Sequence, residues 1–282
     1  MARDQELMLP RWIDHYGTQV GLQNLLVLDD NSTDGSTTDL PCTTYHLPQG
    51  PWKKGFGKTR ERLVNGFARG LLACVDVVIF TDVDELIVPD PAKYSGLGDY
   101  LAARGADIIA PLALEVLHND RLEAPLQPGR PLLEQRRFVK YAPAMCKPLL
   151  KRVPTAWEFA FHGIREPFEI DPDLWLLHLK YADVTVLAEV AEHRRRWHEE
   201  EGRGHPQSFW PMGAEELTNR LRSWTKEADE TGSVPVFDPA EVDLENLVRQ
   251  QEKGYWRAAG AQIAALDTNP LREIPERVRS VL

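Results

Sequence analysis

Three carboxylates that follow an apolar run constrain this chain more than any other feature. The run over residues 77–80 leads to Asp82, Asp84 and Glu85, after which the chain turns apolar again. A short apolar run bounded by polar residues predicts a buried strand, and parallel sheets bury their strands on both faces. Ligands of open α/β sheets bind just outside the carboxyl ends of the strands. We therefore expect an α/β fold with a ligand site at these carboxylates.

The spacing of the carboxylates predicts a divalent cation. Clustered carboxylates repel one another and lose hydration, which is costly unless a cation or hydrogen bonds compensate. Residues two apart in an extended chain lie on the same side, so Asp82 and Asp84 present hard oxygen ligands together. Such ligands suit Mg²⁺ or Mn²⁺ carrying a phosphorylated substrate.

Composition disfavours several classes of protein. The chain has 282 residues and a formal net charge of −10, which argues against a nucleic-acid-binding surface. Its three cysteines are scattered and form no C-x-x-C pair, so we expect a reducing compartment without disulfides or a zinc ribbon. No apolar run reaches the roughly 18 residues that span a bilayer, and no signal peptide is visible. The expectation is a cytoplasmic protein without a transmembrane segment.

Periodicity divides the chain into an alternating β/α part and a charged, helical part. Helical spacing predicts helices over residues 7–16, 58–72, 94–103, 184–201, 214–230 and 241–253. Apolar runs predict strands over residues 24–28, 43–47, 77–80, 106–116, 133–141, 145–153 and 175–179. We expect a nucleotide-binding and catalytic domain over 1–182 and a helical, acceptor-side portion over 183–282, as an extension or as part of the same domain.

The beginning of the chain departs from the usual order of a doubly wound domain. Such a domain opens with a strand that leads to the first ligand loop, whereas only Met1 and Ala2 precede Arg3 and Asp4. We expect that the first strand is truncated or begins upstream of this numbering.

Four motifs follow one another along the chain: Arg3-Asp4-Gln5-Glu6, Trp12-Ile13-Asp14-His15-Tyr16, Leu28-Asp29-Asp30-Asn31-Ser32-Thr33-Asp34-Gly35-Ser36 and Phe80-Thr81-Asp82-Val83-Asp84-Glu85. Together they resemble the GT-A glycosyltransferases, most closely the family 2-like and family 92-like group. The resemblance covers residues 1–90 and extends weakly to His178. It implies a GT-A type Rossmann-like domain with a mixed central sheet, a nucleotide-sugar donor, a divalent metal and inversion at the anomeric carbon.

The resemblance also implies which residues hold the donor. Arg3 and Asp4 would lie at the nucleobase, and Asp30 or its neighbour Asp29 would hydrogen-bond uracil or ribose, with Asn31 in the same loop. The donor would be a UDP-sugar.

For the metal, the resemblance implies that Asp84 binds the ion directly, while Asp82 contacts the donor and the metal region. GT-A enzymes often add a late histidine as a further ligand. We take His178, at the end of an apolar strand, as that ligand, since neutral imidazole binds Mn²⁺. The alternative is a core histidine bonded to a backbone carbonyl.

Inverting transfer also needs a base that takes the proton of the acceptor hydroxyl. Residues 157–163 combine aromatic rings with a carboxylate and a histidine, a composition that suits a sugar platform with a base. Glu158 is the first choice for this base and His162 the second, with Glu115 and Asp120 in reserve. An ordinary amphipathic strand edge is the alternative interpretation.

Several basic residues suit the diphosphate of a donor. Lys147 would contact it from a strand, and Lys58, like Lys54 before it, from near the start of a helix, whose N–H groups attract anions. The run over 194–196 is better explained as a solvated helix face with neighbouring glutamates. His205 lies in a loop that suits an acceptor lid.

These features together predict a metal-dependent, non-processive glycosyltransferase that adds one sugar to a hydroxyl of a discrete acceptor, such as a small metabolite, a nucleoside or a glycan. One alternative is a sugar-phosphate nucleotidyltransferase, but Asp4 and Glu6 stand where that class has a basic, glycine-rich loop. The other is a non-catalytic GT-A-like scaffold, against which the intact pair Asp82 and Asp84 argues.

Overall fold

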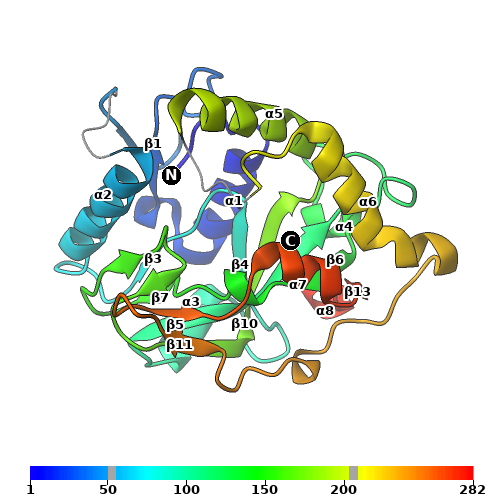
Figure 1. Ribbon diagram of the computed structural model, residues 1–282. Coiled ribbons are helices and arrows are strands. Elements are labelled where there is room, and N and C mark those ends of the chain that lie inside the picture. The colour runs from blue at the N-terminus through cyan, green and yellow to red at the C-terminus, as the bar shows by residue number, and fades with distance from the viewer. Residues whose placement is uncertain (50–54, 203–208, 282) are drawn as a thin grey trace.

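The structure is a computed structural model that describes residues 1–49, 55–202 and 209–281. Lys54 and His205 lie outside the described residues. The fold is mixed α/β, as the sequence predicts, and the described residues form three sheets with helices packed around them (Figure 1).

A seven-stranded mixed sheet forms the centre of the fold. Its strands are β3 (Val78–Ile79), β4 (Glu85–Pro89), β5 (Ile108–Leu117), β6 (Phe138–Tyr141), β7 (Leu150–Lys151), β10 (Glu169–Tyr181) and β13 (Arg272–Glu273). The order is β13–β6–β5–β10–β4, and β7 joins β5 to β3. Only β5 and β10 run parallel within it. All residues of β5 are buried, which explains its unbroken apolar sequence.

Two smaller sheets flank the central one. In the first, β1 (Leu26–Asp29) pairs in parallel with β2 (Thr43–His46), and Ala2 forms a parallel bridge to β1 on its other side. This bridge brings the turn after Ala2 next to the loop after β1. The second sheet is antiparallel and contains β11 (Val248–Gln250), β12 (Trp256–Ala258), β9 (Gly163–Ile164) and β8 (Trp157–Glu158).

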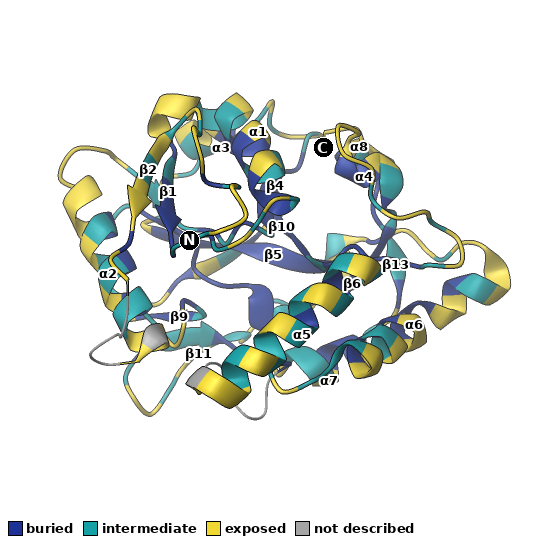
Figure 2. Cartoon of the chain, turned by 90° about the horizontal axis from the view of Figure 1, so that it is seen from above, coloured by how far each residue is buried: buried dark blue, intermediate teal, exposed yellow. Residues whose placement is uncertain are grey.

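Helices pack around the central sheet, against β4, β6 and β10. Those of at least two turns are α1 (Met8–Val20), α2 (Phe56–Leu71), α3 (Leu97–Ala103), α5 (Val184–Glu201), α6 (Ala214–Thr231) and α7 (Gln262–Thr268). The shorter ones are α4 (Leu132–Gln135), α8 (Glu276–Arg279), η1 (Leu22–Asn24), η2 (Pro143–Met145) and η3 (Pro239–Glu241). Figure 2 shows α5 and α6 side by side. Together with α7 they bury a second apolar cluster against Leu117, Phe138 and Tyr181 of the sheet.

Three predicted elements are wrong in whole or in part. The predicted helix over 241–253 is wrong, because this stretch contains the end of η3 and strand β11, with a left-handed residue at Asn246. Over 133–141 the chain forms α4 before β6, since short apolar runs do not distinguish the two types. Over 145–153 only β7 is extended, because Pro148 has no N–H for a ladder. The portion over 183–282 is therefore not all-helical, and its strands β12 and β13 pair with β9 and β6.

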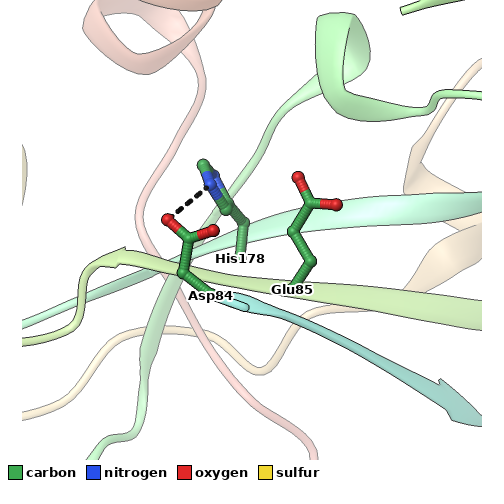
Figure 3. A group of neighbouring side chains, drawn as sticks. All are labelled: Asp84, Glu85 and His178. Atoms are coloured by element: carbon green, nitrogen blue, oxygen red, sulfur yellow. Dashed lines mark ion pairs between the residues drawn. The ribbon is translucent and has the colours of Figure 1, made fainter. Parts of the chain in front are cut away.

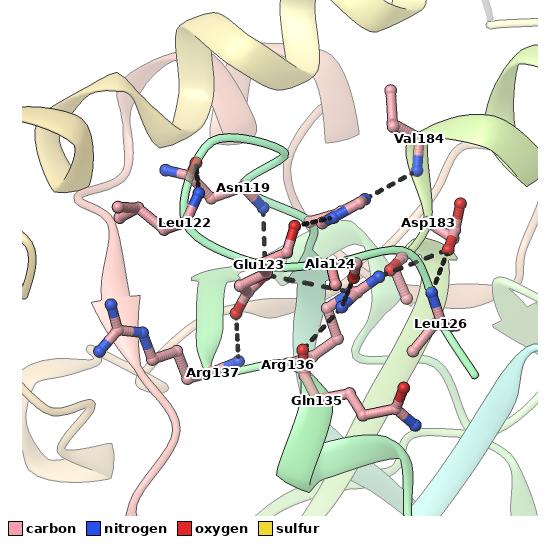
Figure 4. A network of polar contacts seen from close by, with 12 residues as sticks. Asn119, Leu122, Glu123, Ala124, Leu126, Gln135, Arg136, Arg137, Asp183 and Val184 are labelled. Atoms are coloured by element: carbon pink, nitrogen blue, oxygen red, sulfur yellow. Dashed lines mark hydrogen bonds and ion pairs between the residues drawn. The ribbon is translucent and has the colours of Figure 1, made fainter. Parts of the chain in front are cut away.

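A buried arginine joins the loop after β5 to the start of α5 (Figure 4). Arg136 is 1% exposed, and its guanidinium donates to the carbonyl oxygens of Ala182 and Ala124 and lies 3.4 Å from the carboxylate of Asp183. Asp183 in turn caps α5 by accepting from the backbone N–H of Thr185 at 2.9 Å. One side chain thus fixes where α5 begins relative to the sheet.

We expect Arg136→Met to lower the free energy of unfolding by about 3 kcal/mol, because it leaves buried acceptors without their donor. Urea unfolding measures this loss. Arg130→Met, in an exposed position just before α4, is the matched control and should change stability by less than about 0.5 kcal/mol. Equal losses in the two variants would contradict the role of Arg136.

Candidate functional site

A turn between two short strands presents the carboxylates. The predicted strand over 77–80 is β3, which ends before the turn. The expectation of an extended chain at Asp82 and Asp84 is wrong, because β4 begins only at Glu85, whose N–H donates to the carbonyl of Asp82 at 3.1 Å. The indole of Trp12 donates to Thr81 at 2.8 Å and ties the turn to α1. The side chains of Asp82 and Asp84 keep 29% and 19% exposure, so both can reach a ligand.

The strand register brings four charged residues into one row across the sheet. Lys140 on β6 lies opposite Glu115 on β5, Glu115 opposite His178 on β10, and His178 opposite Glu85 on β4. Side chains of directly opposite residues lie on the same face. The amide of Gln262, at the start of α7, donates to Glu115 and closes this face.

His178 lies near Asp84 and Glu85 (Figure 3), and one of its ring nitrogens meets the carboxylate of Glu115. Its Nδ1–H donates to Glu115 at 2.8 Å, and its Nε2 lies 3.5 Å from the carboxylate of Asp84. Burial alone would lower the pKa of His178, but Glu115 and Asp84 outweigh it and raise the pKa to about 10. Burial likewise opposes ionisation of Asp84, yet His178 and Arg194 hold its pKa well below the usual range.

The residues around His178 fit a divalent cation. Ligand atoms of Asp84, Glu85 and His178 lie within 4.8 Å of one another. Two ligands that bind one ion at about 2.1 Å and at right angles stand about 3 Å apart, close to the spacing of Asp84 and His178. Metal-bound histidines typically donate their other N–H to a carboxylate, as His178 does to Glu115. The donor set of imidazole and carboxylate suits Mn²⁺ or Mg²⁺.

The neighbouring carboxylates have other partners. Glu85 forms a buried ion pair with Lys147 at 2.5 Å and accepts the N–H of Asp82 at 3.1 Å, so both of its oxygens are engaged. Asp82, expected to reach the metal region, forms an ion pair with Arg60 and lies outside the ligand group. Burial opposes ionisation of Asp82, but Arg60 and Lys147 lower its pKa. Lys147 therefore lies at the site, where it pairs with Glu85.

Two cations of the site were missed from the sequence. Lys180 follows His178 by two residues on β10, a spacing that would have placed both on one side of the strand. Arg194 of α5 was assigned to a solvated face, although its charge helps to lower the pKa of Asp84. Burial lowers the pKa of Lys180 to about 7, and Arg194 adds to this effect.

The two loops of the expected donor site lie together. Asp4 accepts the backbone N–H of Thr33 at 2.7 Å, and Arg3 lies 3.9 Å from Asp30. Asn31, between them, is left-handed with a φ of 60°. Asp29, by contrast, turns toward β2 and lies 2.8 Å from a ring nitrogen of His46.

Lys58 and the reserve residue Asp120 are engaged away from the carboxylate cluster. The amine of Lys58 lies 3.3 Å from Glu61 on the outer side of α2, whereas Arg60 reaches Asp82. Asp120 forms an exposed ion pair with Arg222 at 2.8 Å.

The two candidates for the base differ in position. Glu158 on β8 forms an ion pair with Arg165 at 2.5 Å, and no described contact joins it to the carboxylate cluster. His162 donates from Nδ1 to the carbonyl of Ala144 at 2.8 Å, which leaves its Nε2 as an acceptor. Burial lowers the pKa of His162 to about 3, and the charge of Lys147 contributes. The preceding residue, Phe161, has its ring 4.9 Å from the guanidinium of Arg60, so His162 is the candidate that adjoins the site.

Comparison with family models, curated proteins and solved structures finds no match for this chain. Within the described residues, no helix has both the length and the apolar character needed to cross a membrane.

We expect Lys147→Met to lower the free energy of unfolding by about 3 to 5 kcal/mol, because it leaves Glu85 buried without a countercharge. The double variant Lys147→Met with Glu85→Gln should recover part of this loss. Urea unfolding of the four proteins of this cycle measures the coupling. Additive losses would show that the two side chains do not depend on each other.

Proposed function

We propose that this chain is a metal-dependent glycosyltransferase of the GT-A type. It would move a sugar from a nucleotide-sugar, a UDP-sugar by resemblance, to a hydroxyl of a discrete acceptor. The observation that carries the proposal is the arrangement Glu115–His178–Asp84, in which one carboxylate orients an imidazole toward another. Such an arrangement is typical of metal sites. Helix α5 reaches the loops that resemble the donor loops of this family, since its Trp197 contacts Arg3.

Asp84 and His178 would hold Mn²⁺ or Mg²⁺, with Glu115 orienting the imidazole. The bound ion would act as a Lewis acid on the leaving diphosphate. Arg60 holds the carboxylate of Asp82 in an ion pair. Arg3 and Asp30 would bind the nucleoside, since they lie together where the turn after Ala2 meets the loop after β1.

His162 is better placed than Glu158 to act on the acceptor. Its Nε2 is an unprotonated acceptor, because Nδ1 donates to Ala144. A low pKa makes it a weak proton acceptor, so its main contribution would be to orient the acceptor hydroxyl by a hydrogen bond. Glu158 is held by Arg165 and would need to leave that ion pair to take part.

We expect UDP to stabilise the protein only when Mn²⁺ is present. At about 100 times the dissociation constant, a ligand adds about 2.7 kcal/mol to the free energy of unfolding, which thermal unfolding detects. GDP and dTDP are tested in parallel. The absence of metal-dependent stabilisation by any of the three would count against the proposal.

In the same measurement, Asp84→Asn should weaken Mn²⁺-dependent binding of UDP at least roughly 10-fold, and Glu115→Gln should weaken it about 10-fold through His178. Asp76→Asn, an exposed aspartate just before β3, is the matched control and should bind as the wild type does. Unchanged binding in Asp84→Asn would reject Asp84 as a ligand.

For the base, we expect His162→Ala to lower the rate of UDP-sugar hydrolysis roughly 10-fold and Glu158→Gln to leave it within about 2-fold. The reason is that only His162 adjoins the carboxylate cluster. Release of UDP under saturating donor and Mn²⁺ measures both rates. The opposite ranking would restore Glu158 as the base.

A further inference from the structure

Lys180 places an amine beside the candidate site without a carboxylate partner, and an anion bound there would favour the charged form of this amine. Its amine lies 3.9 Å from the ring centroid of Phe209 and 4.9 Å from that of Tyr181. Among the described residues, no carboxylate lies within ion-pair distance of this amine. Lys180 is half-buried, so its amine is held partly away from solvent. The aromatic rings therefore position a cation that lacks its anion.

Tyr181, next in the chain, brings a hydroxyl to the same place. Its side chain is completely buried, and its oxygen has no hydrogen-bond partner among the described residues. Buried hydroxyls are nearly always hydrogen-bonded, because an unpaired one loses its hydration without compensation. A β-bulge explains the direction of the ring: His178 pairs with Glu115 and Tyr181 with Leu117, so both lie on the face of the charged row.

Helix α5 gives the order of these groups relative to the donor loops. Trp197 contacts Arg3, whose guanidinium lies 5.0 Å from the indole ring. Arg194 is about one turn, roughly 5 Å, closer to the start of the helix. Ala191, about one turn earlier again, packs in the apolar cluster that contains Tyr181. Measured along α5 from Trp197, which marks the nucleoside end, Tyr181 therefore lies farther away than Arg194.

We propose that Lys180, Arg194 and the hydroxyl of Tyr181 form a subsite for an acidic group, a carboxylate or a phosphate, on the molecule that accepts the sugar. The inference rests on the proposed function. Three donors, two of them charged, match the oxygens of an anion, whereas a neutral hydroxyl also needs an acceptor. The nearest acidic side chain in the row, Glu115, is already engaged by His178 and Gln262. The position beyond Arg194 assigns the subsite to the acceptor and not to the nucleoside.

The test measures binding of three probes, glucuronate, glucose 6-phosphate and glucose, by calorimetry in the presence of UDP and Mn²⁺. At least one acidic probe should bind more tightly than glucose, and the two acidic arms distinguish carboxylate from phosphate. Lys180→Met should lower the affinity for that probe roughly 10-fold or more, and Lys180→Arg should keep part of the affinity that Lys180→Met loses. Tyr181→Phe keeps the ring packing. It should lower the affinity for the probe about 3-fold without lowering the free energy of unfolding. Lys226→Met, an exposed lysine of α6, is the matched control.

Equal affinity for glucose, no binding of either acidic probe, or unchanged binding in Lys180→Met would each overturn the proposal. A further outcome is that Lys180→Met loses as much affinity for UDP as for the probe. That result would assign these cations to the donor diphosphate and would also overturn the proposal. If wild-type protein fails to bind UDP with Mn²⁺, the proposed function is rejected. Binding of the acidic probes without UDP then still reports whether the anion subsite exists.

Discussion

The contact of His178 with Glu115 is the interaction on which the rest of this structure depends. Buried charges are costly unless each has a partner, and the row across the central sheet satisfies this condition residue by residue. Glu115 binds His178 and the amide of Gln262, while Lys140 donates to the carbonyl of Leu266 at 2.7 Å. Gln262 and Leu266 both belong to α7, so these two hydrogen bonds from the row fix the position of this short helix. The same charges that build the candidate site thus also position the elements around it.

The site is less acidic than the chain as a whole, because its cations balance its carboxylates. The whole sequence carries ten more acidic than basic residues (43 against 33), whereas four cations surround the carboxylates of the site. They are Arg60, Lys147, Lys180 and Arg194, and only the first two have a carboxylate partner among the described residues. A site of this kind can bind anions although the chain as a whole is acidic, since local fields depend on the nearest charges. The arrangement favours substrates that bring their own negative charge.

Much of the fold could be predicted from local patterns, and the failures have identifiable reasons. Helix α5 and strand β5 were predicted closely, because cap residues and unbroken apolar runs are local signals. Asp84 and His178 were predicted as one site, but the support from Glu115 was not, because it depends on the parallel register of β5 and β10. Glu158 was chosen as the base from its neighbours in sequence, whereas its partner Arg165 lies on the adjacent strand region and engages it. Pairing between strands is set by packing, which a single sequence does not display.

Arg194 illustrates how a helix can pack as a core element and also supply charge. Leu187 and Ala191 are buried against the sheet, and Arg194 follows them at the next position of the same stripe, seven residues after Leu187. Arg195, rotated by about 100°, instead pairs with Glu192 and Glu199 on the outer face. The three consecutive arginines are therefore not equivalent, and the phase of the apolar stripe decides which one turns inward. Because the cap at Asp183 and the arginine that binds it fix this phase, the charge beside Asp84 depends on a contact made at the start of the helix, about three turns away.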